Sequence, residues 1–442
     1  MSSRVLSVAV FLQVLLIKEW RSTLSNFESN KLMKHGNIYQ ALAWNMVGVC
    51  FLYLCRWLVS VSVVRLSADF ISAGILILAI SITNIWNTVA FFSVRNIQVS
   101  DINCEFSDGE YIATRVFTVT VAAILCAAHV ITSSQNVYQW LVTIVLMLFI
   151  ISLAFADVMH GILQKKWRMD LIGISNILKG ILLLVSFVIL FIFFDLLTAV
   201  IGMTVFSFLV VLLYDMPYVR KYTDIRISFS FIRILQLIKT CFPLFIVSLL
   251  FILIPSLTRI ALERQTNTEM LGIYGSVTLP AAMAQTVALS AFAPIVNMFT
   301  KCFSEKDYKG FLRIFWIGLV GVTAVFLLFF ILSFPFGGWL LDMIFDTEAA
   351  QYANLFSEAI LFSMFVCLGW FIALPLIVLR KTIVQVIVYG GGAIVCIVLL
   401  PFMISAFGVS GANYVQILVN ALIFIALFCV TIVISKKEFI KQ

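Results

Sequence analysis

Long apolar runs recur along the whole chain and constrain its fold more than any other feature. Twelve of them are 19 to 28 residues long, and about 20 residues suffice for a helix to cross the hydrocarbon core of a membrane. Backbone polar groups must pair internally in lipid, and the runs lack the ten-residue alternation of barrel strands. The expected spans are 43–64, 70–93, 111–131, 139–160, 171–194, 196–214, 234–257, 271–298, 311–333, 353–379, 382–405 and 411–434.

Composition agrees with this interpretation and excludes a soluble protein. Of the 442 residues, 63% are hydrophobic and 11% are charged, too few polar side chains to cover a soluble surface. Nine cysteines without a CxxC pair and three scattered histidines indicate neither a disulfide framework nor a metal site. We therefore expect an all-α integral membrane protein of about 12 transmembrane helices, with no metal, no cofactor and no catalytic residue.

The basic residues predict the orientation. With the N-terminus placed inside, 22 of the 29 Lys and Arg residues fall on the cytoplasmic side, three on the outer side and four within spans. Cytoplasmic loops of membrane proteins carry such an excess. Both termini are therefore expected in the cytoplasm, and the net charge of +8 follows from topology. Nucleic acid is not an expected partner, whereas the lipid bilayer is.

A weak internal repeat predicts two lobes of six helices each. Arg65-Leu66 followed by Gly74-Ile75 is similar to Arg259-Ile260 followed by Gly272-Ile273, with the glycines 198 residues apart. Many transporters consist of two such repeats with the substrate handled between them. The expected division is a lead-in at 1–32, a first lobe at 33–214, a basic cytoplasmic linker at 215–233, a second lobe at 234–435 and a basic cytoplasmic tail at 436–442.

The lead-in holds an apolar run, 5–17, that is too short to span a membrane. No small-residue cleavage site follows this run, unlike in a signal peptide. A cytoplasmic or interfacial segment is expected, and the alternative is that translation begins at Met33.

Ionisable residues within spans are the candidate site residues, because each is costly in lipid unless it is paired or hydrated. Arg56 lies too deep in its span to reach either interface, so it faces a water-filled cavity or bonds to neighbouring helices. Lys179 is the second deep cation, with the same two interpretations. Arg115 and Lys239 lie about one turn from the cytoplasmic ends of their helices, where they reach the interface or contact substrate.

Asp157 is expected level with Arg115, either as its structural ion-pair partner or as a proton-coupling carboxylate. Asn84 and Asn87 are candidate polar residues of a cavity, although helix-to-helix hydrogen bonding is the ordinary role of such side chains. No deep acid is expected within the spans. Deep cations without deep acids favour an anionic substrate, above all a phosphate or pyrophosphate that arginine binds with two parallel hydrogen bonds.

One stretch resembles a known family. Residues 91–101 read FFSVRNIQVSD, and Tyr111 to Arg115 form a Tyr-x3-Arg element. Both are similar to elements of the Wzx-type bacterial oligosaccharide flippases of the multidrug/oligosaccharidyl-lipid/polysaccharide (MOP) exporter superfamily, although Ile97 replaces the usual aromatic residue. The stretches SAGILILAISITN (72–84), CFPLF (241–245) and GIYGSVTLP (272–280) are also similar. The resemblance covers residues 34 to 300, and the last four helices match in spacing only.

The resemblance implies a flippase of the bacterial cytoplasmic membrane that moves undecaprenyl-pyrophosphate-linked oligosaccharide for surface polysaccharide synthesis (O-antigen, capsule or exopolysaccharide). The family is thought to work by alternating access of two lobes around a cationic cavity. Arg56 and Lys179 would then bind the pyrophosphate, and Arg115 and Lys239 would receive it at the cytoplasmic mouth. Other polysaccharide assembly proteins are possible partners.

Two alternatives remain open at this point. A multidrug antiporter of the same superfamily would be expected to carry an intramembrane acid. A membrane polysaccharide polymerase would carry its reactive residues on long outer loops. The longest expected outer segments are 334–352 and 258–270, and only the first holds an acidic cluster, at Asp342, Asp346 and Glu348. The ordinary interpretation of that cluster is a solvated loop.

Overall fold

The computed structural model describes residues 38–440, except 68–69, 102–103, 134–135, 224–228, 291 and 346. The expected lead-in at 1–32 lies outside these residues. The described chain is helical, and its elements are α2 (Ile38–Leu66), α3 (Ile71–Phe91), α4 (Val94–Ser100), α5 (Asp108–Thr132), α6 (Val137–Lys165), α7 (Met169–Phe193), α8 (Leu196–Val210), the π-helical turn η1 (Val211–Asp215), α9 (Met216–Tyr222), α10 (Phe231–Gln265), α11 (Thr268–Ser290), α12 (Ala293–Ser304), α13 (Tyr308–Ile344), α14 (Thr347–Ala350), α15 (Ala353–Val378), α16 (Thr382–Phe407) and α17 (Val409–Ile440).

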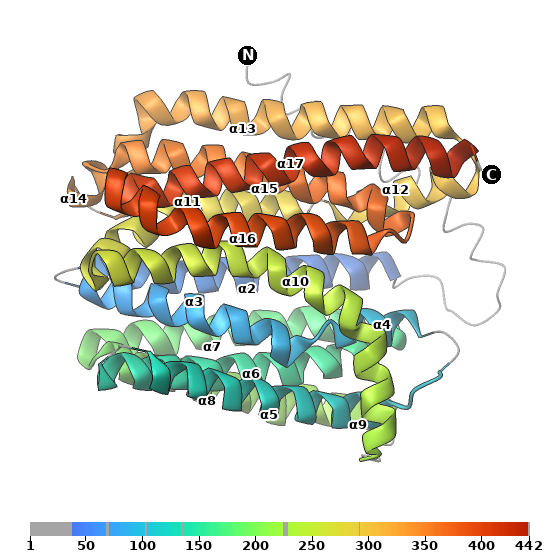
Figure 1. Cartoon of the computed structure of the whole chain (residues 1–442). Helices are drawn as coiled ribbons and strands as arrows, with labels where there is room; N and C mark the ends of the chain where they lie inside the picture. Colours follow the sequence, from blue (N-terminus) through green and yellow to red (C-terminus); the bar gives the residue numbers. More distant parts are fainter. Residues whose placement is uncertain are drawn as a thin grey trace.

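The long helices form two lobes, seen as the blue-to-green and the yellow-to-red halves of Figure 1. In the first lobe α2 packs against α7, α3, α5 and α6 pack on one another, and α8 packs on α6 and α7. In the second lobe α15 packs against α11, α13 and α17, and α16 packs against α10 and α17. The lobes meet mainly where α3 packs against α10 and α11.

Eleven helical segments of the described chain are long and apolar enough to cross a membrane. The chain is therefore a multi-pass membrane protein. The eighth expected span is the exception: α11 occupies its place but is not among the eleven. The orientation predicted from the basic residues would place the end with α14 outside and the opposite end, with α12, in the cytoplasm (Figure 1). These are called the predicted outer end and the predicted inner end below.

The helices differ from the expected spans at several places. The expected eighth span is divided between α11 and α12, and α17 continues into the expected tail, to Ile440. The sixth span does not stop at residue 214 but continues through η1 and α9 to Tyr222, so the expected linker begins as helix. Helix α10 reaches Gln265 and therefore includes Arg259, which was expected in an outer loop. Helix α13 reaches Ile344, so most of the expected outer segment 334–352 is helix.

The helical structure of these expected outer segments argues against the polymerase alternative. Asp342 belongs to α13, and the side chains of Asp346 and Glu348 lie outside the described residues. Between α10 and α11 only residues 266 and 267 are not helical. In the described chain the long outer loops on which a polymerase would depend are therefore not formed.

The two repeat-related glycines meet at the contact between the lobes. A Cβ added to Gly272 would lie 2.9 Å from the backbone nitrogen of Gly74 and closer still to the carbonyl oxygen of Phe70. A Cβ added to Gly74 would lie 2.8 Å from the carbonyl carbon of Thr268. Only glycine permits this close approach of α3 and α11. The repeat therefore has a structural meaning, since each copy supplies one glycine to a reciprocal crossing near the predicted outer end.

Two side-chain contacts hold the lobes together at the same end. Arg65, in the last turn of α2, donates from Nε to the carbonyl oxygen of Ile344 at 2.7 Å, and its Nη2 also binds the carbonyl of Met343. A cation here satisfies the free carbonyls that end α13. Gln139 of α6 donates to the hydroxyl of Thr268 on α11 at 3.2 Å. The predicted outer end is thus closed by backbone packing and by polar bonds.

Candidate functional site

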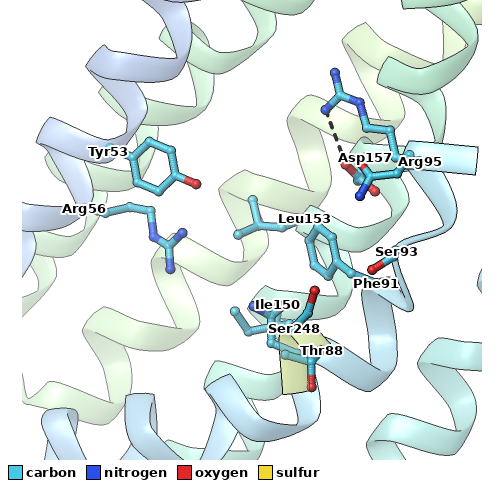
Figure 2. Close-up of a pocket in the computed structure, with 12 residues that line it drawn as sticks. Tyr53, Arg56, Thr88, Phe91, Ser93, Arg95, Ile150, Leu153, Asp157 and Ser248 are labelled. Carbon is cyan, nitrogen blue, oxygen red and sulfur yellow. Dashed lines mark hydrogen bonds and ion pairs between the residues drawn. The ribbon is translucent and has the colours of Figure 1, made fainter. Parts of the chain in front are cut away.

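A cavity of about 520 Å³ lies toward the predicted inner end, mostly within the first lobe. Helices α2, α3, α4 and α6 supply nearly all of its lining, and α10 of the second lobe adds Ser248. Figure 2 shows the Arg56 guanidinium and the Arg95–Asp157 pair on opposite sides of it. The lining residues are Tyr53, Arg56, Asn87, Thr88, Phe91, Ser93, Arg95, Asn96, Ile150, Leu153, Asp157 and Ser248.

Arg56 contributes an unpaired positive charge to the cavity. Its side chain is half-buried and extends from α2 beside Tyr53 into the cavity (Figure 2). The guanidinium carbon lies 5.8 Å from the centre of the Phe149 ring, a cation–π distance. Among the described residues no carboxylate pairs with it. Such a buried cation needs water or an anionic ligand, because its desolvation is otherwise uncompensated.

Asp157 lies between two arginines. Its Oδ2 accepts from Nη2 of Arg115 at 2.7 Å, and its Oδ1 pairs with Nη1 of Arg95 at 3.3 Å. The Arg115 side chain is 0% exposed, whereas those of Asp157 and Arg95 are 13% and 29% exposed. The expected Arg115–Asp157 pair is therefore present, and it forms the rigid wall behind the cavity. Arg95 is the more accessible partner, and it also donates to Gln164 at 2.9 Å.

The site carries an excess of positive charge. Arg56 and Arg95 line the cavity with a single carboxylate, that of Asp157, and the buried Arg115 binds this carboxylate from behind. Together these four groups carry a formal charge of +2 in the described part of the site. Charges close together in a partly buried site interact more strongly than in water. Such a site can bind an anion, and arginine suits phosphate in particular because its donors form a planar fork.

The sequence stretch from Arg95 to Asp101 folds as α4 and its C-terminal end, which connect α3 to α5. Gln98 is buried and donates to the carbonyl of Val158 on α6 at 3.2 Å. Asp101 accepts from the Tyr111 hydroxyl at 2.9 Å and from the backbone nitrogens of Glu105 and Phe106. Burial alone would raise the pKa of Asp101, but these hydrogen bonds outweigh it and lower the pKa below its usual value.

The junction between α3 and α4 has a strained backbone. Phe92 and Ser93 both adopt positive φ, at 45° and 53°, a region that non-glycine residues rarely occupy. The Phe92 ring stacks on Phe245 of α10 with centroids 4.1 Å apart. Arg115 donates to the carbonyl of Ala90 at 2.7 Å, so the arginine that binds Asp157 also holds the end of α3. The cavity wall, the strained junction and the second lobe are thus in direct contact.

Lys179 does not line the cavity, contrary to the cavity role that the sequence analysis considered. Its Nζ donates to Oδ2 of Asp215 at 2.6 Å, and the two side chains are 1% and 0% exposed. His160 Nε2 lies 3.3 Å from the other oxygen of Asp215. The expectation that the spans hold no deep acid is therefore wrong: the continuation of the sixth helix through η1 carries Asp215 into the first lobe, where it neutralises Lys179.

Of the remaining candidate residues, one lines the cavity and two do not. Asn87 lines the cavity, and its side-chain oxygen is buried without a donor among the described residues. Asn84, one turn earlier on α3, is half-buried but is not among the lining residues. Lys239 is exposed on α10 and does not line the cavity either.

Arg95 was not predicted as a site residue, because it falls just outside the expected span 70–93 and counts as a loop charge. The signal was present, since Arg95 opens the stretch that carries the family resemblance. Tyr53, Thr88 and Ser248 carry no comparable signal. Within the described chain no three His, Cys, Asp or Glu residues are grouped so that they could hold a metal ion.

Solved structures with a similar arrangement of helices include MATE family transporters. An inward-facing multidrug resistance MATE family transporter of the MOP superfamily matches with a TM-score of 0.65 and 12% identity, over 89% of this chain and 98% of that one. An outward-facing form matches with a TM-score of 0.63 and 14% identity, over 92% and 99%. The Vibrio cholerae MATE transporter VcmN in the bent form matches with a TM-score of 0.58 and 14% identity, over 91% and 97%.

The chain has a MATE-like transporter fold. At these identities the likeness concerns the fold, and the neighbours are transporters, not enzymes. No family model matches the sequence, and no curated protein matches it.

Proposed function

We propose that the protein is a flippase that moves undecaprenyl-pyrophosphate-linked oligosaccharide across the bacterial cytoplasmic membrane by alternating access. The observation that carries this proposal is the positive charge of a cavity at the predicted inner end, where Arg56 and Arg95 line the wall with a single carboxylate, Asp157, which the buried Arg115 also neutralises from behind. A site with this charge favours an anionic head group. The closed crossing at Gly74 and Gly272 supports a cycle in which cargo enters from the cytoplasmic side.

The arginines have different roles in this proposal. Arg56 is free of carboxylates in the described chain, and Arg95 holds Asp157 only at 3.3 Å in a partly exposed pair. These two guanidinium groups bind the pyrophosphate. Arg115 stays bound to Asp157 and keeps the wall in place, because its side chain is 0% exposed and leaving it buried without its carboxylate would cost more than freeing the partly exposed Arg95. Phosphate binding releases Asp157 from Arg95, which makes this carboxylate a coupling residue.

A multidrug antiporter is the second candidate, and two observations favour it. The structural neighbours are multidrug transporters. The first lobe also holds acids that the sequence analysis did not expect or treated mainly as ion-pair partners: Asp157 at the cavity and Asp215 behind it. Each is paired with arginine or lysine, and the cavity as a whole is positive. An organic cation is therefore the poorer electrostatic match.

Transport in proteoliposomes distinguishes these proposals. Translocation of a fluorescent undecaprenyl-pyrophosphate oligosaccharide is measured for the wild type, Arg56→Ala and Arg56→Lys, with Arg313→Ala as the control. Arg313 is an exposed arginine of α13 and lies outside the cavity. Loss of a charge-assisted hydrogen bond to phosphate of about 1.5–3 kcal/mol predicts roughly 10- to 150-fold slower translocation in Arg56→Ala.

Arg56→Lys should keep part of the activity, since it retains the charge but loses the planar fork. A parallel assay follows uptake of a fluorescent organic cation driven by a proton gradient. Cation uptake without lipid-linked sugar translocation, by protein shown to be folded, would establish the antiporter instead.

A further inference from the structure

A second cavity, of about 410 Å³, lies in the predicted outer half of the protein, away from the proposed cargo site. Trp86 of α3 and His129 of α5 line it from the first lobe, and Arg264 of α10 lines it from the second lobe. Leu125, Ala128, Thr132 and Ser133 complete the lining. The cavity therefore lies on the seam between the lobes, and its shape depends on how they are docked.

The polar groups of this cavity suit an anion. Arg264 is exposed and has no ion pair among the described residues, and it lies close enough to His129 for the two to interact electrostatically. The only nearby acid in the sequence of α10, Glu263, accepts a hydrogen bond from Thr268 and does not line the cavity. An anion bound in this cavity would thus contact one permanent cation, Arg264, and the imidazole of His129. The described lining contains no carboxylate.

The other walls suit a lipid. The Trp86 and His129 rings pack edge to face with centroids 5.9 Å apart, and Leu125 and Ala128 provide apolar surface that is exposed on α5. The indole N–H of Trp86 is buried and has no acceptor among the described residues. A buried donor without a partner is costly, and an acceptor entering beside the ring would remove that cost. Tryptophan, basic side chains and apolar surface together are typical of sites for lipid head groups near a membrane interface.

The state of the protein indicates which lipid occupies the cavity. The lobes are closed at the predicted outer end by the Gly74–Gly272 crossing, and the residues that line the cargo cavity lie toward the other end. Cargo bound in this state lies near Arg56, on the far side of that closure. The second cavity is then reached only from the surrounding outer leaflet, where phospholipids are the abundant source of phosphate.

We propose that this cavity binds the phosphate of an anionic phospholipid in the outer leaflet, held between Arg264 of one lobe and His129 and Trp86 of the other. A phosphate in that position bridges the lobes and stabilises the state that is closed at the predicted outer end. This role is independent of the nature of the cargo.

Native mass spectrometry of the full-length protein tests the binding site. Phosphatidylglycerol and phosphatidylcholine of equal chain length are titrated against the wild type, Arg264→Gln, His129→Asn and the charge-matched control Arg313→Gln. We expect one tight phosphatidylglycerol site in the wild type and in Arg313→Gln, weakened about tenfold or more in Arg264→Gln and less in His129→Asn. Melting temperatures of all variants show whether each one is folded.

Two outcomes would overturn the proposal. If phosphatidylglycerol binds Arg264→Gln as tightly as it binds Arg313→Gln, the cavity is not an anionic lipid site. If undecaprenyl pyrophosphate, titrated in the same way, loses affinity in Arg264→Gln while phosphatidylglycerol does not, the cavity holds the phosphate of the cargo lipid.

A separate measurement tests whether the lipid stabilises the state that is closed at the predicted outer end. In nanodiscs, spin labels at the outer ends of the two lobes should report a larger closed population with phosphatidylglycerol than with phosphatidylcholine alone. This difference should shrink in Arg264→Gln. An equal response of wild type and Arg264→Gln would show that the lipid acts elsewhere.

Discussion

Adding one methyl group at the glycine crossing should change which side of the protein is open. In Gly272→Ala the new Cβ would lie 2.9 Å from the Gly74 nitrogen and closer to the Phe70 carbonyl oxygen. Ordinary Cβ contacts begin at 3.4 Å, so α3 and α11 must move apart by at least about 0.5 Å. Both obstructing atoms belong to helical backbone or its immediate N-terminal cap, so neither can rotate away.

The cost of this overlap follows from the packing of the interface. Inserting a methyl group into a tightly packed contact destabilises it by about 1–3 kcal/mol. Only the state closed at the predicted outer end contains the contact, so that state should lose population by about 5- to 150-fold relative to the open one. Gly74→Ala should act in the same direction from the other lobe, since its Cβ would overlap the carbonyl group of Thr268.

Double electron–electron resonance measures this shift. Labels at Val137→Cys on α6 and Phe407→Cys on α16 are both exposed and report the separation of the lobes at the predicted outer end, after the native cysteines are replaced. Gly391→Ala on α16 is the matched control, because nothing lies within 4 Å of a Cβ added there. Any gain in helix propensity from Gly to Ala is common to test and control.

We expect longer distances in Gly272→Ala than in the control. The same distance distribution in Gly272→Ala and Gly391→Ala would refute the conclusion that this crossing closes the protein.

Three further predictions concern polar groups. Lys179→Met leaves Asp215 buried without its cation and should destabilise the protein by about 3–5 kcal/mol, seen as a lower melting temperature that Lys179→Met/Asp215→Leu largely restores; no recovery would contradict the pairing. Arg65→Gln removes a cation from the end of α13, worth about 0.3–1 kcal/mol, and should open the predicted outer end less than Gly272→Ala in the same distance measurement. Asp101 has a lowered pKa, so its contribution to stability is present at neutral pH and is lost as the pH falls below about 4; Asp101→Asn should melt lower at pH 7 and lose this difference in acid.

The sequence predicted the helices better than it predicted the partners of the buried charges. The spans follow from apolar runs of sufficient length, which is a local property, and eleven of them are confirmed. Residue 215 shows where this reasoning fails. A charged residue normally ends an apolar run, so Asp215 was placed in a linker. In the structure the helix continues through a π-helical turn, and Asp215 meets Lys179, 36 residues away in the sequence. Only the tertiary packing of α7 against this turn pairs the two charges.

The candidate site shows the same limit. Depth in a span predicted Arg56, and antiparallel neighbours predicted the Arg115–Asp157 pair, because both depend on position along single helices. Arg95 could not be assigned in that way. It reaches the cavity because the backbone of Phe92 and Ser93 turns through positive φ, and no local pattern of residues predicts that turn.

The glycine crossing is built from both lobes, whereas the charged cavity is built almost entirely from the first. Both lobes contribute one glycine to the crossing, so the closing contact is symmetric. The cavity is not: its arginines and Asp157 all belong to the first lobe, and Ser248 is the second lobe's contribution to the described lining. When the lobes move relative to each other, Ser248 moves with the second lobe, whereas Arg56, Arg95 and Asp157 all stay in the first. In the proposed cycle an anion bound by Arg56 and Arg95 therefore stays with the first lobe while the second lobe moves, so that the exposed side of the cavity changes without a change of ligands.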